Sequence, residues 1–150
     1  MEALKMGFKK GELLDSNVTR IELTSIKDSR GELVVAEAMG SIPYEINRCY
    51  FIHNIPEGSE RGHHAHYQCS QVISCIKGTC KLIVDDGTEK RELVLDRPNL
   101  GYLVGPFVWH YLKEITSDAL IMVYADAKYE EKDYIRDYET FLKVVGDFYR

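Results

Sequence analysis

The chain has 150 residues, enough for one domain that buries a hydrophobic core without disulfides or a structural metal. A net charge of -5 without a basic cluster argues against a nucleic-acid surface, and no apolar run approaches the ~20 residues that span a bilayer. The N-terminal residues lack the apolar stretch of a secretory signal, and the four cysteines form no C-x-x-C pair, so we expect a reduced, cytoplasmic protein.

Short β-forming runs follow one another along most of the chain. Residues 18–23 alternate between apolar and polar side chains, and a turn at residues 28–31 leads into a second strand at residues 32–37. Further strands are expected at residues 48–53, 64–77, 80–84, 91–95, 102–104, 109–113 and 119–125. The Asp85-Asp86-Gly87 turn is a strong hairpin signal, so the strand before it pairs either with the strand after it or with the preceding long strand. Many short strands with Gly and Pro between them predict a sandwich or barrel.

Only the C-terminal segment has a different periodicity. Between residues 133 and 148, apolar side chains recur at steps of three and four, which predicts an amphipathic helix on the outside of the barrel. No linker or repeat divides the chain, so residues 1–150 are expected to form a single domain.

Three of the five histidines lie within the segment Arg61–His66. Side chains two positions apart on a strand point to the same face, so His64 and His66 are expected to project side by side, with His63 on the opposite face. Paired imidazoles on a rigid strand suit either metal binding or proton transfer near neutral pH.

The spacing around this pair resembles the first cupin motif. The pair is followed by Gln71 and Gly78, and residues 105–110 form a degenerate second motif that ends at His110. In cupins these motifs lie on facing strands of a small β-barrel. The resemblance therefore implies an all-β cupin (jelly-roll) fold with a C-terminal helix, in which His110 lies near the pair.

Two chemistries remain open for these histidines. His64, His66 and His110 could together hold iron, nickel, manganese or zinc. Gln71, however, stands at the carboxylate position of metal-binding cupins, and its neutral amide is a weak ligand. Alternatively, a neutral imidazole removes a proton from a carbon beside a carbonyl and its neighbour returns one, while charge repulsion keeps one ring neutral. We favour this second chemistry, which uses no metal and no cofactor.

Several motifs, taken together, narrow the choice of reaction. They are residues 42–46 with Arg48 and Tyr50, residues 61–66 with Gln71, Val72 and Gly78, Gly101, residues 105–106 and 109–110, Tyr129, residues 133–138 and Phe141. Between residues 21 and 145 this set resembles the cupin-fold, WxcM-like 3,4-ketoisomerases that act on dTDP-4-keto-6-deoxyglucose.

The resemblance implies that the C4 ketone and the C3 hydroxyl of the hexose are exchanged through an enediol or enediolate. His64 and His66 match the family's catalytic pair, and we expect His66 to abstract the C3 proton while His64 assists the transfer. Tyr50 matches a tyrosine of the family's pocket, where it would relay a proton or donate to the enediolate; plain strand packing is its alternative.

Further residues are assigned to substrate binding. Arg48 and Arg61 are the candidates to pair with the diphosphate, since guanidinium groups bind phosphate bidentately. Arg136 is expected instead to form a structural ion pair with Asp133 or Asp137. Gln71 and Trp109 are also expected beside the substrate.

Arg30 and His110 align with positions at which family members that make gluco and galacto products differ. The Arg/His combination resembles the galacto-producing type, so we expect a galacto product and substrate contacts from both residues.

We therefore expect a metal-independent isomerase in the pathway to a 3-amino-3,6-dideoxyhexose of bacterial surface polysaccharides. The resemblance also implies a homodimer in which N-terminal strands are exchanged between subunits. The rival interpretations are a metal-dependent cupin dioxygenase, a nucleotide-sugar epimerase and a non-catalytic cupin that binds sugar nucleotides.

Overall fold

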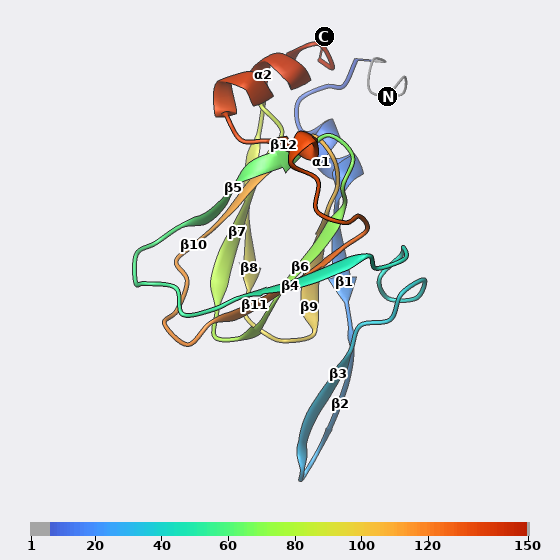
Figure 1. The fold of residues 1–150 in the computed structure, drawn as a ribbon, viewed down its shortest axis with the longest axis vertical. Coiled ribbons are helices and arrows are strands. Elements are labelled where there is room, and N and C mark those ends of the chain that lie inside the picture. The colour runs from blue at the N-terminus through green and yellow to red at the C-terminus, as the bar shows by residue number, and fades with distance from the viewer. Residues whose placement is uncertain (1–6, 150) are drawn as a thin grey trace.

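A computed structural model describes residues 7–149, which form two facing antiparallel sheets and a separate hairpin (Figure 1). The first sheet contains, in spatial order, β1 (Val18–Glu22), β9 (Leu100–Val104), β6 (Gln71–Lys77), β11 (Leu120–Ala125) and β4 (Arg48–Ile52). The second contains β12 (Tyr134–Ile135), β5 (Arg61–His66), β10 (Trp109–Lys113), β7 (Cys80–Asp85) and β8 (Lys90–Leu95). Side chains from both sheets, such as Ile73, Leu82 and Ile121, form the main core. The predicted all-β fold with a C-terminal helix is confirmed.

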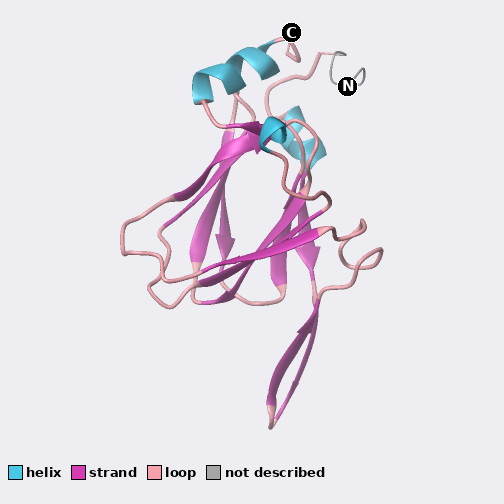
Figure 2. Ribbon diagram, viewed as in Figure 1, coloured by secondary structure: helices cyan, strands magenta, loops and turns pink. Residues whose placement is uncertain are grey.

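The helical segments lie at one end of the barrel (Figure 2). They are α1 (Glu12–Asn17), the 3-10 turn η2 (Glu131–Asp133) and α2 (Tyr138–Gly146). The buried face of α2, with Phe141 and Val145, packs in a second core cluster with Trp109 and Ala65 of the second sheet. No helix within residues 7–149 is long and apolar enough to cross a bilayer.

The prediction that the C-terminal helix begins near residue 133 is wrong. Asp137 is the N-cap of α2, and its carboxylate accepts hydrogen bonds from the backbone N–H and the hydroxyl of Thr140, at 2.9 and 2.8 Å. Before this cap, β12 is extended and pairs with His66 and Ala65 of β5. The three- and four-residue spacing of apolar side chains continues on both sides of residue 137, so it does not show where the helix begins. The N-cap Asp137 does show it.

The predicted long strand from residue 64 to 77 is also wrong. The chain turns at residues 67–70, which places β5 in the second sheet and β6 in the first. Carboxylates from a distant segment hold this turn: Asp133 accepts from the backbone N–H of Gln68, and Asp126 accepts from that of Ser70. The prediction failed because the turn at residues 67–70 is stabilised by contacts distant in the sequence, and the local sequence has no turn signal there.

The predicted hairpin after residue 84 is confirmed, and it pairs β7 with β8. Asp86 Oδ1 accepts from the backbone N–H groups of Thr88 and Glu89, and Gly87 adopts a φ of 89°, where a side chain would be strained. On its other edge β7 pairs with β10, so the strand that carries His110 lies between β7 and β5.

The N-terminal hairpin of β2 (Thr24–Asp28) and β3 (Gly31–Val35) extends away from the barrel, at the end opposite α2 (Figure 1). Two of its large apolar side chains are mostly in solvent, since Ile26 is 54% and Leu33 is 59% exposed. Exposed apolar surface on a hairpin is typical of a protein–protein contact site.

Candidate active site

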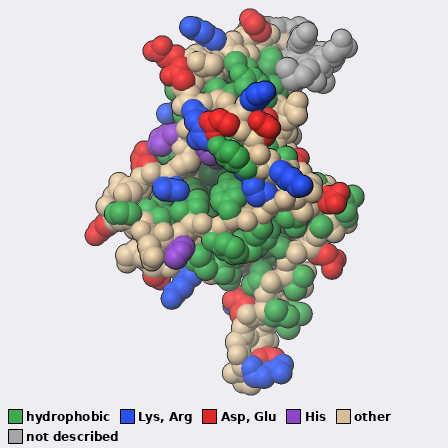
Figure 3. All heavy atoms as spheres, viewed as in Figure 1, with side chains coloured by type: hydrophobic (Ala, Val, Ile, Leu, Met, Phe, Trp, Pro, Cys, Tyr) green, Lys and Arg blue, Asp and Glu red, His purple; other side chains and the backbone are tan. Residues whose placement is uncertain are grey.

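A cavity of about 470 Å³ opens between the two sheets. Its walls are mainly apolar, with Ile52, Ile73, Leu112 and Val123 among the lining residues. Figure 3 shows hydrophobic atoms within the hollow and Lys or Arg side chains around it. Five residues that the sequence analysis assigned to catalysis or substrate binding line it: Arg48, Tyr50, Arg61, His64 and His110. A few polar groups on apolar walls are typical of small-molecule sites.

His64 lies opposite His110 in the pairing of β5 with β10, and the centroids of their rings are 4.6 Å apart. Burial, and then the nearby His110, lower the pKa of His64 to about 2, so its imidazole is neutral at physiological pH. Its Nε2 atom is buried and has no hydrogen-bond partner among residues 7–149. This neutral ring therefore has a nitrogen free to take a proton.

His66 has a different environment although it lies on the same face of β5. It is 2% exposed and is not among the residues that line the cavity. Its Nδ1 lies 2.9 Å from Asp133 Oδ2, and its Nε2 lies 2.6 Å from the side-chain nitrogen of Gln71. Burial lowers the pKa of His66, and the hydrogen bond to Asp133 opposes that shift. Both ring nitrogens are thus engaged within the protein.

His110 is buried beneath the cavity, with 4% of its surface exposed. Its Nδ1 donates to the carbonyl of Val108 at 3.1 Å, which leaves Nε2 unprotonated in the neutral ring. Burial lowers the pKa of His110 to about 4. The ring therefore offers the site a neutral acceptor rather than a positive charge.

Arg48 provides a positive charge at the cavity. Its guanidinium lies 5.4 Å from the ring centroid of Tyr50 and 5.7 Å from that of Tyr129, and it contacts the Tyr134 hydroxyl at 3.5 Å. Its Nε is buried without a partner among residues 7–149. A half-buried guanidinium without a carboxylate partner among residues 7–149 is a suitable site for an anionic ligand.

The C-terminal segment contributes three cavity residues that the sequence analysis did not assign to the site: Tyr129, Tyr134 and Arg136. The expected ion pairs of Arg136 are wrong, because its guanidinium pairs with Glu131 at 2.7 Å and lies 4.1 Å from the Tyr134 ring centroid. Tyr134 and Arg136 are two positions apart, so strand alternation through this segment would have placed them together.

Three residues expected beside the substrate do not line the cavity: Gln71, Trp109 and Arg30. Gln71 is 1% exposed, and its amide is hydrogen-bonded to His66 and Tyr50. Trp109 precedes His110 on β10, and strand alternation turns it to the outer face, where it packs 5.2 Å from Tyr138 and 5.6 Å from Phe141 between ring centroids. Arg30 lies at the tip of the β2–β3 hairpin and pairs with Asp28. Neither lines the cavity of its own chain.

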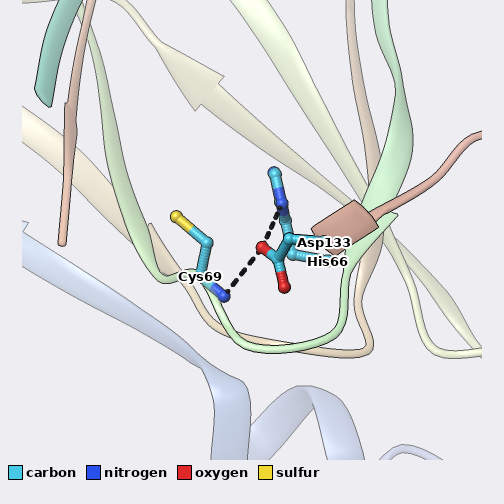
Figure 4. Close-up of side chains that lie close together, drawn as sticks. All are labelled: His66, Cys69 and Asp133. Carbon is cyan, nitrogen blue, oxygen red and sulfur yellow. Dashed lines mark hydrogen bonds and ion pairs between the residues drawn. The ribbon is translucent and has the colours of Figure 1, made fainter. Parts of the chain in front are cut away.

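Asp133 is the site residue whose role the sequence analysis missed. Its carboxylate accepts hydrogen bonds from His66 and from the backbone N–H of Cys69, the latter at 3.1 Å (Figure 4). It also accepts from the backbone N–H of Gln68 at 2.8 Å. Candidate ligand atoms of His66, Cys69 and Asp133 lie within 4.8 Å of one another. Burial raises the pKa of the Cys69 thiol to about 12, however, and the other two groups are already hydrogen-bonded. The set therefore fits a hydrogen-bond network better than a metal site.

The buried histidines predict a loss of stability in mild acid. The pKa values of His64 and His110 are about 2 and about 4 in the folded protein, below the ordinary 6.5 that the unfolded chain restores. The unfolded state therefore binds more protons below pH 6.5, and stability falls as the pH falls.

From pH 7 to pH 5 these two residues are expected to lower the free energy of unfolding by roughly 4 kcal/mol. Urea unfolding at the two pH values measures the change. The control variant, His53→Gln at an exposed loop residue, should show the same pH-dependent change in the free energy of unfolding. Equal stability of the unmodified protein at both pH values would contradict the argument from burial.

Comparison with known proteins places the same elements in a family. Residues 16–146 match the family described as FdtA, WxcM-like, C-terminal. The TDP-4-oxo-6-deoxy-alpha-D-glucose-3,4-oxoisomerase of Aneurinibacillus thermoaerophilus is 43% identical over 126 residues, covering 84% of this chain and 91% of that protein.

Two solved structures share the fold. One is QdtA, a sugar 3,4-ketoisomerase from Thermoanaerobacterium thermosaccharolyticum in complex with TDP. It is 32% identical with a TM-score of 0.85, over 87% of this chain and 95% of that one. The other is a 3,4-ketoisomerase from Helicobacter canadensis, 33% identical with a TM-score of 0.83, over 86% of this chain and 97% of that one.

Proposed function

Since the chain belongs to the FdtA, WxcM-like family, we propose that it is a sugar-nucleotide 3,4-ketoisomerase that acts on dTDP-4-keto-6-deoxyglucose. The observation that carries the proposal is the neutral His64, with an unpartnered Nε2, in an apolar cavity that Tyr50 also lines. Exchange of a ketone with a neighbouring hydroxyl needs a base at carbon and a group that moves a proton between two oxygens. We assign the first role to His64 and the second to Tyr50.

His64 is the better candidate for the base at C3. The expected assignment to His66 loses support because both nitrogens of that ring are engaged with Asp133 and Gln71. Two guanidinium groups, Arg48 and Arg136, contribute to the low pKa of His64. The diphosphate of the substrate brings negative charge that offsets them, and so raises the basicity of His64 in the complex.

The proposed reaction begins with transfer of the C3 proton to His64. The C–H electron pair becomes a C3=C4 double bond, while the C4 carbonyl oxygen receives the hydroxyl proton of Tyr50 and Tyr50 takes the proton of the C3 hydroxyl. His64 then returns its proton to C4 as the ketone forms at C3. Burial holds the pKa of Tyr50 well above its usual range, so a concerted exchange is required because a free tyrosinate would be too costly.

A single base also bears on the configuration of the product. In a gluco substrate the C3 hydrogen lies on the face of the ring on which a galacto product carries its C4 hydrogen. A histidine that removes one and returns the other from the same side therefore gives the galacto product. The gluco product would need a proton from the opposite face. The engaged nitrogens of His66 thus favour the galacto configuration.

The diphosphate is proposed to bind among the arginines at the cavity. Arg48 is half-buried beside aromatic rings, and the exposed residues Arg61 and Arg136 line the same cavity. A ketone at C3 is the group that a transaminase would convert into an amine, which places the product before a 3-amino-3,6-dideoxyhexose.

A metal is not required by this chemistry. The amide of Gln71 donates to His66 Nε2, the nitrogen that a cupin metal site would use, and provides no carboxylate. Incubation with EDTA followed by desalting is expected to leave the isomerisation rate unchanged within twofold. Loss of activity that returns with ferrous iron or zinc would instead support the metal-dependent alternative.

We also infer a homodimer in which the β2–β3 hairpin is exchanged. Ile26 and Leu33 expose apolar surface on that hairpin. Beside it, Met122 and Tyr124 of the first sheet line a groove together with Glu32 and Val34 of β3. Light scattering should give twice the mass of the chain, and the double variant Ile26→Asp, Leu33→Asp should give one chain. A monomeric unmodified protein would contradict the inference. An exchanged hairpin would also bring Arg30 towards a partner, where its proposed influence on the product could be exerted.

Identification of the product tests the proposed function. Purified protein is incubated with dTDP-4-keto-6-deoxyglucose, and the product is examined by NMR. A ketone at C3 with the galacto configuration at C4 is expected. An unchanged ketone position, or inversion at C3 or C5, would point to a binding protein or an epimerase.

A further inference from the structure

Four buried or half-buried side chains form a continuous hydrogen-bonded chain from the C-terminal segment to the cavity. Asp133 Oδ2 lies 2.9 Å from His66 Nδ1, and His66 Nε2 lies 2.6 Å from the nitrogen of the Gln71 amide. The oxygen of that amide accepts from the Tyr50 hydroxyl at 2.5 Å. His66 and Gln71 are 2% and 1% exposed, so water does not compete for these contacts.

Asp133 fixes the direction of every hydrogen bond in this chain. Two backbone N–H groups, those of Gln68 and Cys69, donate to its carboxylate and stabilise the anion. An anionic carboxylate can only accept, so His66 must carry its proton on Nδ1, and Nε2 must accept from the Gln71 amide. The amide oxygen then faces Tyr50 and accepts its hydroxyl proton.

We propose that Asp133 is a positioning residue that, through His66 and Gln71, orients the Tyr50 hydroxyl for the reaction. With its proton held by Gln71, the Tyr50 oxygen presents its lone pairs to the cavity, where they accept a hydrogen bond from a hydroxyl group. Of the two reacting oxygens of the substrate, only the one at C3 has a proton to donate. The network thus selects the C3 hydroxyl as the partner of Tyr50 before the reaction. The Tyr50 proton then turns from the Gln71 oxygen to the C4 carbonyl oxygen as Tyr50 takes the proton of the C3 hydroxyl.

This proposal rests on the proposed function for the identity of the substrate, but the state of the network can be measured without substrate. In ¹⁵N-histidine spectra of the free protein, His66, assigned with a His66→Asn variant, should show a protonated Nδ1 and an unprotonated Nε2. The variant Asp133→Asn can donate its amide to Nδ1, so the proton should move to Nε2 and the Gln71 amide should reverse.

In Asp133→Asn, kcat is expected to fall on the order of 10- to 100-fold, while KM changes by less than about threefold, because the reacting groups remain but Tyr50 points the wrong way. Asp137→Asn is the matched control, since Asp137 caps α2 and asparagine caps as well. This control should keep both constants and the His66 spectrum.

Asp133 also holds the turn at residues 67–70, so its replacement alone does not separate an effect on the network from an effect on the turn. A second variant makes this distinction. Gln71→Met breaks the link between His66 and Tyr50 without touching Asp133, and should lower kcat by a similar factor while the His66 proton stays on Nδ1. Asp133→Asn added to Gln71→Met should lower kcat little further, because the link it acts through is already gone.

The proposal is overturned by an Nε2 proton on His66 in the unmodified protein. Wild-type kcat in Gln71→Met, or in Asp133→Asn with the proton moved, would also overturn it. Absence of isomerase activity in the unmodified protein would instead refute the proposed function, and the spectra would still decide the direction of the network.

Discussion

His64→Asn is expected to reduce kcat of the isomerisation by about 10³-fold or more, because asparagine is close to histidine in shape but cannot take a proton from carbon. His64 lines the cavity with an unpartnered Nε2, and its burial keeps the ring neutral. Substrate binding should be largely kept, because the diphosphate contacts are assigned to arginines. Steady-state kinetics and equilibrium binding measure the two effects separately.

The matched control is His63→Asn, one position away on the same strand. His63 is exposed, pairs with Glu60 and stacks on Tyr111, with 4.2 Å between ring centroids, and it does not line the cavity. Its variant should have the activity of the unmodified protein. Equal kcat values for His64→Asn and His63→Asn would refute the assignment of the base.

Tyr50→Phe is expected to lower kcat by about 10²- to 10³-fold with little change in KM, because the ring stays in place and only the group that moves protons between O3 and O4 is lost. The variant also leaves the Gln71 oxygen unpartnered in a buried position. A stability loss of about 1–3 kcal/mol should accompany the kinetic effect.

Tyr102→Phe is a suitable control for Tyr50. Tyr102 lies on β9 of the same sheet, packs against the main core and is not among the residues that line the cavity. Its variant should be fully active. If Tyr50→Phe were destabilised but equally active, Tyr50 would be a packing residue, the alternative that its place on a strand also allows.

The local features of the fold could be predicted because they depend on neighbouring residues. Alternation located β10 at Trp109–Lys113, and the Asp85-Asp86-Gly87 turn located the β7–β8 hairpin. The same reasoning joined β5 to β6, because the turn between them depends on carboxylates at residues 126 and 133. Contacts so distant in sequence leave no periodic signal.

The site shows the same limit. Strand alternation placed His64 and His66 on one face, but it could not distinguish the ring at the cavity from the ring engaged with Asp133 and Gln71. That difference is the reason why we propose His64, and not His66, as the base. How deeply each histidine of β5 is buried depends on how the facing sheet and β12 pack over that strand. The alternation pattern of one strand carries no information about this packing.

Trp109 and Arg30 were both expected beside the substrate, and they lie outside the cavity for different reasons. Trp109 is excluded by the alternation that turns His110 inward, and this could have been read from the sequence. Arg30 lies on a hairpin whose direction away from the barrel depends on tertiary structure, and its assigned influence stays a prediction that needs a partner subunit.

The most direct test of the central claim follows a deuterium label at C3 of dTDP-4-keto-6-deoxyglucose. With the unmodified protein, we predict that the label leaves C3 as the 3-keto product forms, and that His64→Asn retains it at C3 over many turnover times. Loss of the label in His64→Asn at the unmodified rate would contradict the assignment of His64 as the base. Retention of the label at C3 by the unmodified protein would contradict the isomerase function itself.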